Sequence, residues 1–370
     1  MEINEKNNGR VSINSKDYDV FFAPQHFSRS QNGYADFSSI RIWLSDKNGK
    51  RAFFKNNSIG SQDSAEIFAM YLAKELGLRC VDVKPANLNY NEKTYSGILS
   101  FDYMNNKEKG SEVIKPFLLE VPNSVLGYLK KIKQLSLREG FVISKNLKND
   151  LLKLCFFDFL TFQKDRHNAN IEFYLSKNQN GEMEINLSEI FDNSLIYFCN
   201  FDSFIDEDLN YFSTLKSKDF QQKYFLEKEN IVKKLSQSPY ISKYCCFNII
   251  DSSDDLDVMF AKEMMDRPFL MDMFNKFCKI DFFKLQERIF DETGFKIDDK
   301  FIIISTILKD LQIYSLNQNL KKQKELNQGV EHENWPLLQK FSSWILFQFG
   351  KWNFLLFRQR RWKAVFWKQH

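Results

Sequence analysis

The stretch that decides the fold is LLKLCFFDFLTFQKDRHNANIEFYL, residues 151–175. Its first half, 151–162, is almost entirely apolar, which predicts a buried helix. A polar segment follows from Gln163 to Asn170, and the next residues are again mostly apolar and aromatic, which predicts a strand. The sequence therefore places a short polar loop between a buried helix and a strand.

An aspartate and an asparagine, Asp165 and Asn170, lie on this loop. Phosphoryl transfer needs a carboxylate near the attacking hydroxyl, oxygen ligands for Mg²⁺ and a lysine on the phosphates. The spacing lets Asp165 face a substrate hydroxyl while the side-chain oxygen of Asn170 reaches a metal ion. A hairpin over 171–187 is expected next. Asp192 follows it as a further oxygen ligand suited to Mg²⁺, and we expect the hairpin to return it to the loop.

The amino-terminal part of the chain is rich in predicted strands. Apolar or alternating runs predict them at 20–22, 40–44, 51–55, 81–90 and 95–101. An amphipathic helix is expected over 61–76, and Gly77 is expected to end it. From about residue 110 the pattern becomes mostly helical. The sequence thus predicts a small sheet carrying one helix, followed by a larger helical region.

The segment 151–198 resembles the catalytic half of the HipA-like serine/threonine kinases. That family carries D-R-H-x-x-N, which residues 165–170 match, and then an apolar-Asp-Asn/Cys-Gly/Ser-Ser segment, which Ile190 to Ser194 resemble. The chain looks similar to the compact branch of the family that contains secreted pro-inflammatory kinases. The resemblance extends over residues 20–310 and is strongest in 151–198.

The fold that this resemblance implies is α+β and two-lobed, like that of protein kinases. A small β-rich N-lobe, residues 1–104, would bind nucleotide, and a larger, mostly helical C-lobe, residues 105–328, would carry the catalytic and metal loops. Residues 329–370 form a basic tail with five of the six tryptophans. This tail could contact an anionic membrane surface or nucleic acid. It could equally be a docked helix or an extension without a role.

The same resemblance implies roles for five side chains. Asp165 would be the catalytic base, and Asn170 and Asp192 would hold Mg²⁺. Lys55, at the end of an apolar strand, would bind the phosphates of ATP and pair with Glu66 in the next helix. ATP and Mg²⁺ are the implied cofactors.

Two further segments would contact the nucleotide. The hinge, whose backbone groups would bind adenine, is matched by Ser100, Phe101 and Asp102. The loop over the phosphates would hold Ser28, Ser30 and Gly33. It offers a single glycine where backbone amides usually approach phosphates closely. Ser28 and Ser30 are also candidate phosphorylation sites by similarity.

Each residue has a structural alternative. Asp165 and Asn170 favour turns in general, and Lys55 could be a solvated strand end. Glu66 fits the third helical position of a capping box that begins at Asp63. All five residues occur in the order of the family and on the expected helix, strand or loop. This agreement favours the kinase interpretation over the structural alternatives.

Two neighbours of Asp165 are expected to be structural. Arg166 is predicted to anchor the loop to a carboxylate. His167 is predicted to be an orienting, hydrogen-bonded core residue rather than an acid–base group.

Composition narrows the classes of function. With 52 basic and 48 acidic residues the net charge is +4, which does not by itself imply nucleic acid. The six cysteines form no CxxC pair, which disfavours zinc. Several lie in apolar runs, where a free cysteine behaves as a small hydrophobic residue, and this favours a reducing compartment. The sequence shows neither a Sec signal peptide nor an apolar run of about 18 residues. We therefore predict a cytoplasmic protein, or one exported without a Sec signal.

Three functions compete. The first is a serine/threonine protein kinase, autophosphorylating or acting as a toxin on a translation-related bacterial protein or as an effector on a host protein, with an antitoxin as a candidate partner. The second is a phosphoinositide-type lipid kinase, because residues 165–171 also resemble the catalytic loop of those enzymes, although the segment around Asp192 does not match theirs. The third is a pseudokinase binding module, which the glycine-poor loop favours and the intact metal residues oppose.

Overall fold

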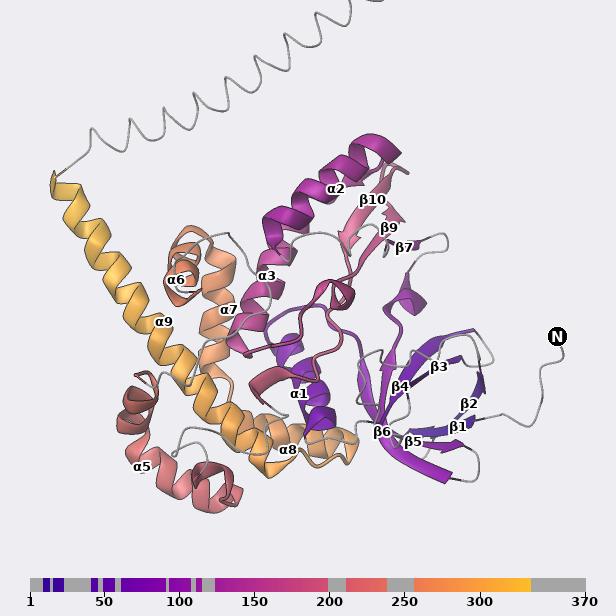
Figure 1. Cartoon of the computed structure of the whole chain (residues 1–370), viewed down its shortest axis with the longest axis horizontal. Coiled ribbons are helices and arrows are strands. Elements are labelled where there is room, and N and C mark those ends of the chain that lie inside the picture. Colours follow the sequence, from indigo (N-terminus) through magenta and orange to yellow (C-terminus); the bar gives the residue numbers. More distant parts are fainter. Residues whose placement is uncertain are drawn as a thin grey trace, which may run out of the picture. The chain divides into compact units, whose positions relative to one another are not determined.

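The computed structural model describes residues 9–13, 16–22, 41–45, 49–56, 61–90, 93–107, 111–114, 124–198, 211–237 and 256–333 (Figure 1). The chain divides into two compact units, Met1–Leu316 and Asn317–His370. The lobe boundaries expected after residues 104 and 328 stay predictions. None of the helices in the described part combines the length and apolar character that crossing a membrane requires.

Within the described residues, six antiparallel strands form the first sheet, which closes on itself in the order β1-β2-β3-β4-β6-β5. The strands are β1 (Gly9–Ile13), β2 (Lys16–Phe22), β3 (Arg41–Ser45), β4 (Arg51–Lys55), β5 (Val83–Tyr90) and β6 (Lys93–Phe101). Successive side chains of a strand point to opposite faces of the sheet, so apolar residues at alternate positions all lie on the same face. The inward residues form one core: Ile42, Leu44, Ala52, Phe54, Ala86, Leu88 and Leu99. The strands predicted from the sequence are confirmed.

Lys55 is the last residue of β4 and is paired on both sides, with Arg41 of β3 and Ile98 of β6. This central position buries the lysine to 5% exposure, so the alternative of a solvated strand end is wrong. Neighbouring Gly97 is required here, because a Cβ atom at that position would collide with the Lys55 carbonyl oxygen and lie 2.9 Å from Asn56 Cα. The requirement for Gly97 was not predicted from the sequence.

The helix α1 (Gln62–Glu75) follows β4 and is buried over ten consecutive residues, 64–73. Ser61 is its N-cap residue, so Glu66 is the fifth helical residue rather than the third. The capping-box alternative for Glu66 is therefore wrong. The predicted C-terminal stop is confirmed, because Gly77 has φ +75° and Leu78 N–H bonds the Ala73 carbonyl in a Schellman-type ending.

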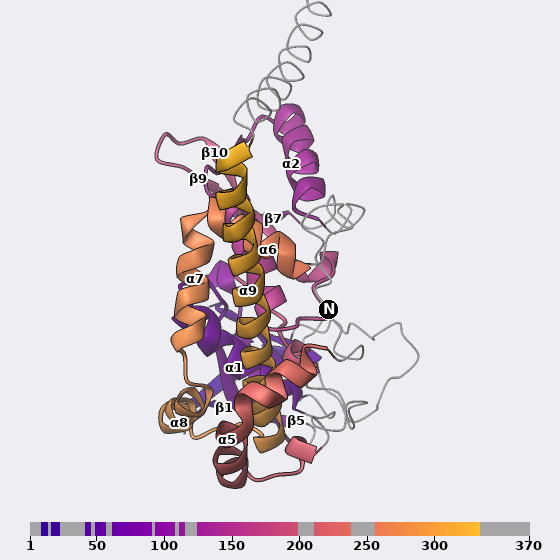
Figure 2. The same cartoon turned by 90° about the vertical axis from the view of Figure 1, so that its left-hand side faces the viewer.

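The remainder of the described chain is mostly helical, as predicted. Its helices are α2 (Val125–Glu139), α3 (Leu147–Leu160), α5 (Ser217–Leu235), α6 (Leu256–Asp266), α7 (Pro268–Lys279), α8 (Phe282–Thr293) and α9 (Asp299–Glu333), the last of which crosses the boundary between the units. The helix α8 lies beside α1 in both views (Figures 1 and 2). The predicted α+β class is confirmed.

A second, four-stranded sheet has the order β7-β9-β10-β8. It contains β7 (Glu112–Ile114), β8 (Val142–Ile143), β9 (Phe173–Lys177) and β10 (Met183–Leu187). The strands β9 and β10 form the predicted hairpin around residues 178–181. Because α3 ends just before the polar loop and β10 ends just before Asp192, the hairpin returns the chain to that loop.

Candidate active site

A buried lysine joins the first sheet to α1. The Nζ atom of Lys55 donates to Oε1 of Glu66, and the Lys55 and Glu66 side chains are only 7% and 1% exposed. Strand β4 delivers the lysine at its end, and α1 presents the glutamate on its buried face. The structure therefore pairs these two residues as the sequence resemblance implied.

The same ammonium contacts a third residue from far along the chain. Lys55 Nζ lies 3.1 Å from Oδ1 of Asp192. The attraction of Lys55 outweighs burial and lowers the pKa of Asp192 to about 2. Burial opposes the charged form of Lys55, but Asp192 and Glu66 outweigh it and raise the lysine pKa well above its usual value. Burial raises the pKa of Glu66, and the attraction of Lys55 opposes this rise. Lys55 and Asp192 are therefore ionised near neutral pH.

Asp192 has a left-handed backbone, with φ +53°. Aspartate is one of the few residues other than glycine that adopts this conformation without large strain. The Gln163 side chain donates to the Asp192 carbonyl at 3.3 Å. The loop before Asp165 therefore fixes the segment that carries Asp192.

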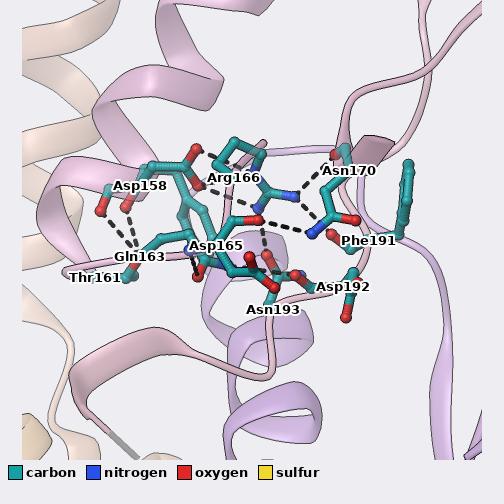
Figure 3. A network of polar contacts seen from close by, with 10 residues as sticks. Asp158, Thr161, Gln163, Asp165, Arg166, Asn170, Phe191, Asp192 and Asn193 are labelled. Carbon is teal, nitrogen blue, oxygen red and sulfur yellow. Dashed lines mark hydrogen bonds and ion pairs between the residues drawn. The ribbon is translucent and has the colours of Figure 1, made fainter. Parts of the chain in front are cut away.

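Arg166 ties the loop and that segment together (Figure 3). Its guanidinium is completely buried and contacts both carboxylate oxygens of Asp158, at 3.0 and 3.1 Å. It also donates to the carbonyls of Asn170 at 3.2 Å and Phe191 at 2.7 Å, and to the Asn193 side chain at 2.6 Å. The predicted anchoring of Arg166 to a carboxylate is confirmed. Because one planar guanidinium group binds both segments, the backbones around residues 170 and 192 are fixed relative to one another.

Asp165 and Asn170 are connected within the loop. The Asn170 side-chain N–H₂ donates to the Asp165 carbonyl at 2.7 Å, which leaves the amide oxygen as the acceptor of that side chain. Figure 3 shows Asp165, Asn170 and Asp192 grouped beside the Arg166 guanidinium. Burial raises the pKa of Asp165, His167 opposes this, and Asp192 adds to it. Asp165 is thus a stronger base than an ordinary surface aspartate.

His167 is not a core residue, which corrects the prediction. Its side chain is 55% exposed, because it lies at the start of a short 3₁₀ turn, η4 (Asn168–Asn170), rather than inside the helical core. Its Nδ1 accepts from Ala169 N–H at 3.1 Å, and its Nε2 lies 3.5 Å from Oδ1 of Asp165. The prediction that His167 is hydrogen-bonded is confirmed.

The expected hinge residues lie at the end of β6. The N–H groups of Phe101 and Asp102 donate to the carbonyls of Asp82 and Arg51, at 2.9 and 3.0 Å. The Asp102 side chain accepts from Met104 N–H at 2.9 Å. These two N–H donors are thus already engaged within the chain.

Three of the predicted nucleotide contacts, Ser28, Ser30 and Gly33, lie outside the described residues, as does the tail beyond residue 333. Asp158, the fully buried partner of Arg166, was not predicted from the sequence. A signal for it existed, because a lone acidic residue inside the apolar run 154–160 is rarely buried without a counter-charge.

The oxygen atoms around Lys55 and Arg166 include donors that suit Mg²⁺. Asp165, Asp192 and the amide oxygen of Asn170 are hard oxygen donors of the type that Mg²⁺ prefers. Lys55 faces two carboxylates, so the immediate charge is negative and favours a cation. Within the described residues, no group of three or more His, Cys, Asp or Glu forms a metal cage. Mg²⁺ in phosphoryl-transfer sites typically uses one or two carboxylates together with substrate phosphates, so the residues fit.

The sequence matches no protein-family model and no curated protein. Among solved structures it is similar to the Helicobacter pylori proinflammatory kinase CtkA, with 16% identity, a TM-score of 0.48, and coverage of 78% of this chain and 95% of that one. It is also similar to Shewanella oneidensis HipA, solved with HipB and operator DNA (13% identity, TM-score 0.37, 74% and 59% coverage). A third similar structure is the Chaetomium thermophilum Rio2 kinase–ADP/Mg²⁺–phosphoaspartate complex, with 13% identity, a TM-score of 0.28, and coverage of 84% of this chain and 72% of that one.

These structural neighbours are kinases. Two of them, CtkA and HipA, are HipA-like kinases, the class that the sequence resemblance named. At these identities the likeness concerns the fold alone.

Proposed function

We propose that the chain is an ATP- and Mg²⁺-dependent serine/threonine protein kinase of the HipA-like type, which transfers the γ-phosphoryl group to a protein hydroxyl. The observation that carries this proposal is the single buried ammonium of Lys55 shared by Glu66 and Asp192. A fixed cation beside an acidic, oxygen-rich cluster is the arrangement that phosphoryl transfer needs.

Each residue then has a role that its surroundings support. Lys55 binds phosphate oxygens of ATP, and Glu66 holds the ammonium in place. Asp192 and the amide oxygen of Asn170 hold Mg²⁺, which supplies neutralisation of the phosphate charge when bound. Burial raises the pKa of Asp165, and this carboxylate accepts the proton of the substrate hydroxyl.

The nucleotide base and the protein partners belong to the same proposal. Residues 100–102 would line the adenine site through carbonyl or side-chain groups, because the N–H donors of Phe101 and Asp102 are engaged. The substrate would be a protein, either translation-related and bacterial or from a host, and an antitoxin is a candidate regulator.

The proposal is tested by mass spectrometry of the purified full chain after incubation with ATP and Mg²⁺. We expect phosphate on serine or threonine of the chain or of an added protein substrate. Asp165→Ala and Asp192→Ala should abolish the transfer, while the exposed Lys74→Ala should not. Phosphoinositide vesicles in a parallel reaction separate a lipid kinase from a protein kinase. Retained transfer in both aspartate variants would reject the assigned roles, and ATP binding without transfer in the wild type would identify a pseudokinase.

A further inference from the structure

Tyr197 lies five residues after Asp192 and is inserted among three phenylalanine rings. Tyr197 is only 1% exposed to solvent. The ring centroids lie 6.5 Å from Phe68, 5.8 Å from Phe282 and 6.3 Å from Phe301, all in edge-to-face arrangements. Such arrangements are favoured by the quadrupoles of the rings and fix the relative position of the elements that carry them.

This aromatic cluster joins α1 to the segment after Asp192. Phe68 lies on α1 two residues beyond Glu66, so its position is coupled to that of the glutamate. The Lys55 ammonium also contacts both the Glu66 and the Asp192 carboxylates. The two segments are therefore connected twice, once through the ion pairs of Lys55 and once through packed rings.

The backbone of Tyr197 is connected to the catalytic loop as well. Its N–H donates to the Thr161 carbonyl at 2.8 Å, and Thr161 is the residue at which α3 ends, four positions before Asp165. Movement of Tyr197 would therefore disturb both the loop of Asp165 and the helix of Glu66.

Two features of Tyr197 oppose this docked position. Its backbone is left-handed, with φ 48° and ψ 36°, which is strained for an aromatic residue. Its hydroxyl is buried and has no hydrogen-bond partner among the described residues. A buried hydroxyl left unpaired loses the hydrogen bonds that it makes with water when exposed. A phenylalanine would keep all the ring contacts and avoid this second penalty.

We propose that Tyr197 is a positioning residue for the kinase site, and this rests on the function proposed above. Docking of its ring holds α1 where Glu66 meets Lys55. The unpaired hydroxyl makes the docked state less stable than the ring contacts would make it without that hydroxyl. The position of α1, and with it the assembled ion-pair trio, is therefore set by an equilibrium that one oxygen atom shifts.

The docking is tested first without nucleotide, by hydrogen exchange and thermal unfolding of the full chain. Tyr197→Phe should raise the melting temperature and slow exchange in α1, because the ring contacts remain and the penalty is removed. Tyr197→Ala should accelerate exchange there. The matched control is Tyr224→Phe: Tyr224 is equally buried, but its hydroxyl bonds Asp310 at 3.1 Å, so that variant should lower the melting temperature. If both Phe variants lower it alike, the proposal is overturned.

Activity measurements separate positioning from general packing. Tyr197→Ala should lower kcat at least about tenfold, because small displacements of reacting groups cost large factors in rate. Tyr197→Phe should keep full activity. The control is Phe156→Ala, which truncates a buried ring in a different cluster with Phe159 and Phe260 and should leave kcat of the folded fraction unchanged. An equal loss of kcat in both alanine variants contradicts positioning. A wild type without phosphotransfer rejects the proposed function, while the exchange comparison still decides the docking.

Discussion

Lys55 and Asp192 are 137 residues apart in the sequence, yet Nζ of Lys55 lies 3.1 Å from Oδ1 of Asp192. Because Glu66 contacts the same ammonium, one buried cation serves two carboxylates from different parts of the fold. The ion pairs connect strand β4, helix α1 and the segment after β10, so they contribute to the fold as well as to the site.

Removing the shared cation should therefore destabilise the protein. Lys55→Met leaves Glu66 buried without a counter-charge, and breaking a buried pair in this way costs about 3–5 kcal/mol. We expect a correspondingly lower free energy of unfolding in urea. Adding Glu66→Gln should recover part of the loss, because the unpaired charge is gone.

Lys74→Met is the matched control for this loss. Lys74 pairs with Asp82 at the surface, where both side chains are about half exposed. Exposed pairs contribute roughly 0–1 kcal/mol, so the control should be close to wild type. Equal stability of Lys55→Met and wild type would show that the pair does not hold the elements together.

The pH dependence of activity should report Asp165. A base works only when deprotonated, and burial raises the pKa of Asp165 above its ordinary value. The acidic limb of kcat/KM should therefore lie at higher pH than that of an ordinary aspartate, with activity falling as pH drops through the raised pKa. Asp165→Asn should lower kcat/KM about 10²–10⁴-fold and remove this limb. An unchanged limb in that variant would assign it to another group.

Arg166 should not be replaceable by lysine. Its guanidinium fills five acceptor positions on Asp158, Asn170, Phe191 and Asn193, and a lysine offers three donors in a different geometry. We expect Arg166→Lys to lower the free energy of unfolding by about 3 kcal/mol or more, since Asp158 stays buried with part of its partner lost. The exposed Arg138→Lys should change it by less than about 0.5 kcal/mol.

Gly97 should be required for the position of Lys55. In Gly97→Ala the new Cβ would collide with the Lys55 carbonyl and Asn56, which pushes the end of β4 away. We expect a raised KM for ATP and a lower melting temperature. Gly181→Ala is the control: with φ +80° and no atom within 4 Å of the added Cβ, it should cost only backbone strain, about 1 kcal/mol, and leave KM unchanged. The reverse order of KM effects would sink this explanation.

Much of the local structure could be predicted because its signals are local. The alternation in β4, the apolar run of α3 and the glycine after α1 each depend on neighbours in the sequence, and each prediction is confirmed. The exposure of His167 and the helical position of Glu66 could not be predicted correctly. Each depends on the residue at which a turn or helix begins, and a sequence pattern leaves that residue uncertain by one or two positions.

The sequence by itself determined α1, α3, the strands β2 to β6, the hairpin of β9 and β10, the polar loop from Gln163 to Asn170 and the residue types suited to phosphoryl transfer. Periodicity and spacing are properties of adjacent residues, so these features could be read locally. Only the tertiary structure decided which carboxylates share Lys55, that Asp158 is the partner of Arg166, and that the buried Tyr197 hydroxyl has no partner in the described part of the chain. Those outcomes depend on contacts between segments far apart in the chain, and burial and counter-charge at a residue are set by such contacts.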